Sequence, residues 1–77
     1  MIWIRFEDYA LRRMRQRNIT EQEVREALEA PASEHRFNPK HGRRNVKRRV
    51  PISGRTILVS YEKRDDETVV INAMEES

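Results

Sequence analysis

Two β-rich runs on either side of Ser53-Gly54 constrain the fold more than any other feature of this 77-residue chain. Glycine readily adopts the positive φ that a two-residue hairpin turn needs. We therefore expect an antiparallel hairpin with strands over residues 44–52 and 55–63. Pro51 indicates that the first strand is not fully paired on both sides at that point. The second strand is apolar on both faces, which predicts a central place in the sheet.

Two helices are expected before this hairpin. Apolar residues at helical spacing predict a first helix that begins near Glu7. It ends at Asn18, because asparagine tolerates the left-handed conformation at a helix C-terminus. Thr20 and Glu23 have the spacing of a capping box, which predicts the start of the second helix. Pro31 ends that helix, so the two helices form a hairpin with a very short connection.

Further strands complete the expected sheet. Alternating apolar residues predict a short strand over residues 2–6, with Trp3 in the core or at an interface. Residues 68–74 form a last strand, and residues 34–38 are a candidate edge strand before a mobile loop over residues 38–42. Helices come early and strands late, which predicts the α+β class. The expected order is β-α-α-β-β-β, with a two-helix hairpin packed on a mainly antiparallel sheet.

Length and composition argue against several classes of protein, among them multidomain, disulfide-bonded and membrane-spanning proteins. The chain is long enough for a single domain over residues 1–77, and it has no cysteine for a disulfide or a thiolate metal site. His35 and His41 have no accompanying carboxylate cluster, and no nucleotide-binding fingerprint is present, so we expect neither a metal nor a cofactor. The apolar run over residues 56–59 is too short to cross a membrane. The opening lacks the features of a signal peptide, so we expect a cytoplasmic protein without membrane contact.

Positive charge is concentrated in the middle of the chain. Residues 35–55 contain eight Lys and Arg and no acid, although the net charge of the whole chain is only +3. Such a concentration attracts phosphate, and an acidic protein partner or plain solvation would suit the same residues. Arg48 interrupts the apolar alternation of its strand, which indicates either a bulge or a place at the sheet margin. The predicted nucleic-acid-binding residues are Arg43, Arg44, Lys47, Arg48 and Arg49.

Short motifs are spread over nearly the whole chain. Residues 6–24 follow the pattern F-x-x-H-A-x-x-R-M-x-x-R-x-I-[ST]-x-x-x-V, with Tyr9 at the position of the His and Asn18 where a glycine is usual. The other motifs are residues 28–31, 42–44, 54–62 and 69–71. In this combination the chain resembles a family of small bacterial proteins of unknown function, which is itself similar to the RelE/ParE toxin fold. The resemblance implies a helix hairpin on an antiparallel sheet.

The resemblance also implies a chemistry. The wider RelE/ParE group includes mRNA-cleaving toxins and gyrase poisons, and other members have no known activity. RNA cleavage requires a base, a charge stabiliser and an acid, and the resemblance implies that Arg, Lys and Tyr side chains share these roles in place of a His pair. The catalytic candidates of these types are Arg49, Arg55 and Tyr61. His41, which lies next to an arginine pair, is a further acid–base candidate. The alternative for Tyr61 is an aromatic packed within a central strand.

Three functions remain open at this point. The favoured one is a toxin-like protein that binds RNA, free or on the ribosome, through the Lys47–Arg49 and Arg55 surface, with or without cleaving it. The second is a nucleic-acid-binding or regulatory module that performs no catalysis. The third is a protein-interaction domain whose basic strand pairs with an acidic antitoxin-like segment.

Overall fold

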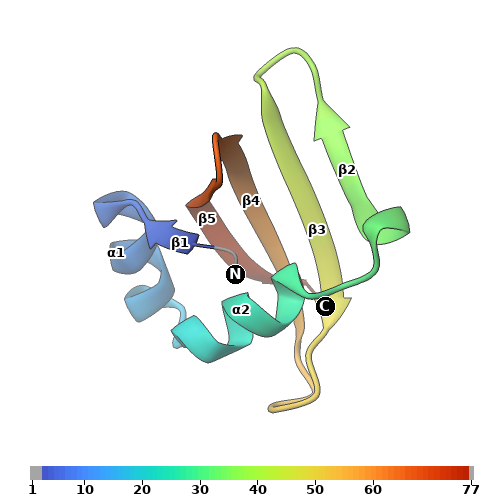
Figure 1. The fold of residues 1–77 in the computed structure, drawn as a ribbon. Coiled ribbons are helices and arrows are strands. Elements are labelled where there is room, and N and C mark those ends of the chain that lie inside the picture. The colour runs from blue at the N-terminus through green and yellow to red at the C-terminus, as the bar shows by residue number, and fades with distance from the viewer. Residues whose placement is uncertain (1–2, 77) are drawn as a thin grey trace.

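Two helices lie on one face of a mixed sheet in the computed structural model, which describes residues 3–76 (Figure 1). In chain order the elements are β1 (Trp3–Phe6), α1 (Asp8–Gln16), α2 (Glu21–Leu28), the 3-10 helix η1 (Ala32–Glu34), β2 (His35–Asn38), β3 (Arg43–Arg49), β4 (Thr56–Arg64) and β5 (Glu67–Glu76). The strands lie in the order β1-β5-β4-β3-β2. β1 runs parallel to β5, and the other neighbouring pairs are antiparallel. The predicted α+β class is confirmed, and the candidate edge strand is present as β2.

The helix ends follow the local sequence. Asn18 has a φ of 55° just after α1, as expected for a residue that terminates a helix in the left-handed region. At the start of α2 the Glu23 amide donates to Thr20 Oγ1 at 3.1 Å, and the Thr20 amide donates to Glu23 Oε1 at 2.9 Å. This is the predicted capping box. No helix within residues 3–76 combines the length and the apolar character needed to cross a membrane.

The connection between β3 and β4 differs from the expected two-residue turn. β3 ends at Arg49 and β4 begins at Thr56, so residues 50–55 form a longer connection, in which Gly54 has a φ of 73°. The physical reason is Pro51, which has no amide hydrogen to donate to a strand ladder. The predicted strand limits of 44–52 and 55–63 were therefore wrong at the turn, although the antiparallel pairing itself was right.

The core lies between the helices and one face of the sheet. α1 packs on β5, whereas α2 packs on β3 and β4. The buried residues of this core are Ala10, Met14, Ile19, Val24, Ala27, Ala30, Val46, Val50, Ile57, Val59, Tyr61, Val70 and Ala73. Both helices cover the same side, so the sheet has a helix side and an open side (Figure 1).

Arg48 lies on the helix side, opposite Ile57 in the register of β3 and β4. It is half-buried, and its Nη1 donates to the carbonyl oxygen of Glu26 at 2.5 Å, in the last turn of α2. The same carbonyl also accepts from the Glu29 amide at 3.2 Å, so the guanidinium is a second donor that links the end of α2 to β3.

Of the two alternatives for Arg48, the bulge is not present in β3 as the structure describes it, because β3 pairs with β4 without a shift, and the register shift lies between Ser60 and Tyr61 in the β4–β5 pair. β2 pairs with β3 only as far as Val46, so among residues 3–76 Arg48 lies where β3 has no partner on that side, as the second alternative predicted.

Trp3 does not belong to the core. Its side chain is 62% exposed, whereas Ile4 and Phe6 of the same strand pack against the core. Successive residues of a strand point to opposite faces, so one strand cannot bury both sets when only one face is covered. The prediction of Trp3 as a core residue was therefore wrong, while its place at an interface stays a prediction.

Candidate functional site

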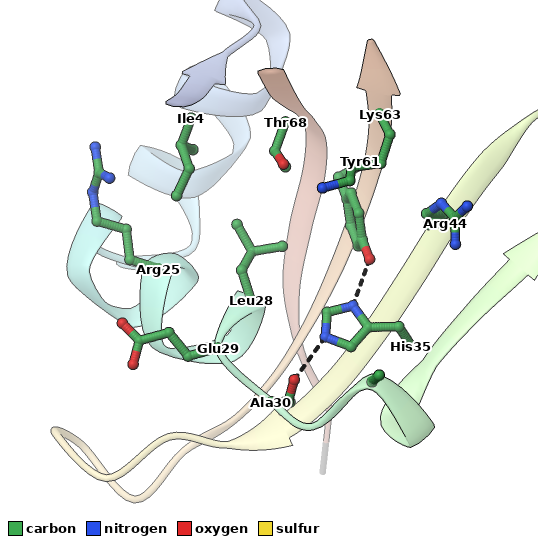
Figure 2. Close-up of a pocket in the computed structure, with 11 residues that line it drawn as sticks. Ile4, Arg25, Leu28, Glu29, Ala30, His35, Arg44, Tyr61, Lys63 and Thr68 are labelled. Carbon is green, nitrogen blue, oxygen red and sulfur yellow. Dashed lines mark hydrogen bonds between the residues drawn. The ribbon is translucent and has the colours of Figure 1, made fainter. Parts of the chain in front are cut away.

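A cavity of about 610 Å³ opens on the helix side, between α2, the start of β2 and the sheet. Its volume lies in the range of small-ligand sites. Ile4 and Leu28 form an apolar part of the lining, whereas His35, Arg44 and Tyr61 form a polar part. Figure 2 shows Tyr61 extending from β4 toward the ring of His35.

His35 and Tyr61 form a hydrogen-bonded pair. The hydroxyl of Tyr61 lies 2.5 Å from Nδ1 of His35, and Nε2 of His35 lies 2.9 Å from the carbonyl oxygen of Ala30 (Figure 2). A carbonyl only accepts, so in the neutral ring Nε2 carries the hydrogen and Nδ1 accepts from the Tyr61 hydroxyl. The two rings meet edge to face, with centroids 5.7 Å apart. The contacts of both ring nitrogens thus fix the orientation of His35.

The strand register brings this pair together. His35 is the first residue of β2 and lies opposite Val46, whose side chain is buried on the helix side. Tyr61 lies opposite Arg44, one pair further along β3 on the same face. Ala30 follows the C-terminus of α2, so its carbonyl faces the edge strand. Three separate elements therefore contribute to one hydrogen-bonded chain.

Cations surround the pair. Arg44 and Lys63 line the cavity on the sheet side, and Arg25 and Glu29 line it on the α2 side (Figure 2). Burial raises the pKa of Tyr61, and the positive charge of Arg44 partly offsets this effect. The lining has more positive than negative side chains, so the cavity suits an anionic ligand.

Arg55, a predicted catalytic residue, lies away from this cavity, in a network at the β3–β4 connection. Its guanidinium is 3.3 Å from Glu23 Oε1 and 3.0 Å from Glu75 Oε1, and it donates to the carbonyl oxygen of Asn18 at 2.7 Å. Burial would raise the pKa of Glu23, but hydrogen bonds from Ser53 and Thr20 and the charge of Arg55 outweigh burial and lower it. These contacts tie both helices to the sheet.

The remaining basic residues divide between the two sides of β3. Arg43, Lys47 and Arg49 alternate with Arg44 and Arg48, so they lie on the open side. Arg43 is 3.7 Å from Glu62 and Lys47 is 3.9 Å from Glu76. A second hollow of about 540 Å³ lies there, with Arg36, Lys47, Arg49 and Leu58 in its lining. The basic strand thus serves two surfaces rather than one.

His41 lies in the turn that joins β2 to β3 and is exposed. It lines neither of these two cavities. Of the predicted catalytic residues, the structure brings Tyr61 into the helix-side cavity and places Arg49, Arg55 and His41 elsewhere. Among residues 3–76, no cluster of three or more His, Cys, Asp or Glu has the arrangement of a metal site.

His35 is the functional candidate that sequence reasoning missed. The turn-forming residues 38–42 between two basic β-rich segments were the available signal, because a hairpin there places His35 opposite Val46. Val46 belongs to the apolar set of its strand, so a residue paired with it would be expected on the buried face of the sheet. The contact of His35 with Tyr61 also depends on the register of the β3–β4 pair, which places Tyr61 opposite Arg44.

Comparison with known proteins identifies the family without assigning an activity. Residues 6–75 match the family model described as a domain of unknown function (DUF4258). No curated protein and no solved structure matches the chain. Because the matched segment covers nearly all of the residues, this protein belongs to the DUF4258 family.

Proposed function

We propose that this protein binds RNA at the helix-side cavity and cleaves its backbone with the His35–Tyr61 pair, as a toxin-like ribonuclease. The observation that carries the proposal is the hydrogen bond between His35 Nδ1 and the Tyr61 hydroxyl in a cavity that Arg44 and Lys63 also line. An oriented imidazole, a phenol and two cations are the group types that phosphodiester cleavage needs. The resemblance to the RelE/ParE fold supports the same reaction class by analogy.

The proposed reaction is attack of the RNA 2′-hydroxyl on the adjacent phosphorus. The 2′-hydroxyl gives its proton to the Tyr61 oxygen as Tyr61 passes its own proton to Nδ1 of His35. The phenol thus remains neutral and the imidazole becomes positive. Arg44 stabilises the charge on the phosphorane oxygens, because its planar guanidinium can hold two of them. The P–O5′ bond breaks, and Lys63 protonates the leaving oxygen. The products are a 2′,3′-cyclic phosphate and a 5′-hydroxyl.

The test is cleavage of one single-stranded oligonucleotide made as RNA and as DNA. We expect the wild type to cut the RNA only, because DNA lacks the attacking 2′-hydroxyl, and mass spectrometry should detect the cyclic phosphate. Tyr61→Phe and His35→Gln should lower the cleavage rate by about 100-fold or more, the usual scale for loss of acid–base catalysis. Cleavage by Tyr61→Phe at the wild-type rate would overturn the assignment.

Matched controls exist within the chain. Tyr9→Phe removes the other tyrosine hydroxyl, from an exposed position on α1. His41→Gln tests the histidine that was the acid–base candidate from the sequence. The proposal assigns that role to His35, so it requires His41→Gln to retain activity. Tyr61→Phe leaves Nδ1 of His35 without its donor at a cost of about 1–3 kcal/mol. Urea denaturation should therefore accompany each assay, so that loss of activity is separated from loss of fold.

A second candidate, RNA binding without cleavage, is favoured by the open side of the sheet. Lys47 and Arg49 border the second hollow there, with Arg36 from the edge strand. This candidate gives salt-dependent binding and intact RNA in the same assay. An acidic antitoxin-like segment would be attracted by the same cations, and peptide binding with no RNA binding at low salt would favour that third alternative.

A further inference from the structure

Phe37 is an aromatic side chain that the fold leaves uncovered beside the cavity. It lies on the edge strand β2 and is 55% exposed. A single exposed apolar residue is normal on a protein surface, so exposure alone carries no argument. The second observation is its neighbour: the guanidinium carbon of Arg44 lies 5.2 Å from the centroid of the Phe37 ring. Arg44 is also part of the cavity lining.

The register places Phe37 on the same side as the His35–Tyr61 pair. Phe37 lies opposite Arg44, and Arg44 lies opposite Tyr61. Phe37 follows His35 by two positions, so both side chains leave β2 on one face, about 7 Å apart along the strand. Arg44 therefore stands between an open aromatic ring and the hydrogen-bonded pair. The order of groups across the face is aromatic, cation, then phenol and imidazole.

We propose that Phe37 is a stacking platform for one nucleobase and that the substrate is single-stranded RNA. This inference rests on the proposed function, since it names the substrate class of the same site. Aromatic side chains stack on bases only when those bases are unpaired and free to splay from their neighbours. With a base on Phe37, the adjoining phosphate falls beside Arg44, and the next sugar falls toward Tyr61. A duplex cannot offer its base faces to Phe37 in this way.

Tyr9 provides a matched control for this proposal. Its ring is 51% exposed, and Arg13 lies over it at 5.7 Å, so it resembles Phe37 in both exposure and cation contact. It differs in position, because it lies on α1 and is not part of the cavity lining. A general effect of losing an exposed aromatic would appear at both sites, whereas base stacking next to the cavity would appear at Phe37 alone.

The test is binding of a fluorescently labelled, fully 2′-O-methylated RNA oligonucleotide, single-stranded and as a duplex of the same sequence. The methyl groups block the attacking hydroxyl, so binding is measured without cleavage. We expect the single strand to bind more tightly than the duplex. Phe37→Ala and Phe37→Leu should weaken single-strand binding by about fivefold or more and leave duplex binding unchanged. Phe37→Trp should restore it, and Tyr9→Ala should match the wild type.

Unchanged single-strand binding by Phe37→Leu, a variant that keeps an apolar side chain on β2, would overturn the proposal. Equal losses in Tyr9→Ala and Phe37→Ala, or equal affinity for single strand and duplex, would overturn it as well. The experiments distinguish failure of the proposed cleavage from failure of the proposed stacking site. Binding that depends on Phe37, together with intact unmodified RNA, would reject cleavage and keep the stacking site. Cleavage with no effect of Phe37→Leu would reject the stacking site alone.

Discussion

The hydroxyl of Tyr61 is the atom on which the proposed chemistry depends. The residue is 4% exposed, and burial raises its pKa above the ordinary value of 10.0, because low-dielectric surroundings disfavour the phenolate. Arg44 acts in the opposite direction, since its positive charge stabilises the phenolate. At neutral pH the hydroxyl therefore keeps its proton, and its oxygen lies 2.5 Å from Nδ1 of His35. A proton relay through Tyr61 starts from this state.

Alkaline titration tests this account directly. The chain has two tyrosines, so Tyr9→Phe leaves Tyr61 as the remaining phenol, and its ionisation can be followed by ultraviolet absorbance. We expect a midpoint above 10.0 in the folded protein and a return to the ordinary value in urea. Adding Arg44→Ala should raise the midpoint further, because it removes the charge that favours the phenolate. A midpoint below 10.0, or a fall on adding Arg44→Ala, would contradict this description of the site.

Among the elements, β3 combines structural and exposed basic residues on one strand. Arg48 and Arg49 are neighbours in sequence but lie on opposite sides of the sheet. Arg48 is half-buried and donates to the carbonyl oxygen of Glu26, whereas Arg49 is exposed and donates to the carbonyl oxygen of Gly54 at 3.1 Å. A variant that removes both arginines would therefore mix loss of a structural bond with loss of an exposed cation.

The two single variants should separate these roles. Arg48→Ala removes a charged hydrogen bond between β3 and the end of α2, and we expect it to lower the free energy of unfolding by about 1.5–3 kcal/mol. Arg49→Ala removes an exposed side chain and should change stability by about 0.5 kcal/mol or less. Urea denaturation of both variants at neutral pH measures the difference. Equal effects would mean that the bond from Arg48 to α2 contributes nothing to stability.

How far the sequence predicts these elements depends on the range of the signals involved. Thr20 and Glu23 predicted the start of α2 correctly, because a capping box is complete within one turn of chain. Gly54 did predict a turn, but Pro51 ended the strand pairing earlier than expected. The contact between His35 and Tyr61 needs the registers of the β2–β3 and β3–β4 pairs at once, and no local pattern specifies both. The candidate site was thus less predictable than the fold class.

Across the whole molecule, positive charge is distributed over both sides of the sheet. The helix side has Arg44 and Lys63 at one cavity, and the open side has Lys47 and Arg49 at the second hollow. Lys47 is 60% exposed and already lies 3.9 Å from the Glu76 carboxylate. The proposed function assigns the principal phosphate contact to Arg44. Variants of Arg44 and Lys47 can therefore show which side of the sheet RNA occupies.

The salt dependence of RNA binding distinguishes the two sides. For single-stranded RNA each phosphate contact contributes about 0.7 to the slope of log affinity against log salt. We expect Arg44→Ala to reduce the slope by about this amount and Lys47→Ala to leave it unchanged within error. Anisotropy titrations at several salt concentrations, with circular dichroism to verify folding, make the comparison. The opposite pattern would place RNA on the open side and favour binding without cleavage.

The parallel pairing of β1 with β5 joins segments from opposite ends of the described chain. Trp3 lies opposite Glu67 and Phe6 opposite Val70, and Ile4 and Thr68 from these two strands both line the helix-side cavity. During translation β1 emerges before β5, and all the other helices and strands of the described residues are made between them. The cavity therefore cannot be complete on a nascent chain that still lacks β5. For a protein proposed to cleave RNA, the order of synthesis itself delays the activity until β5 has been made.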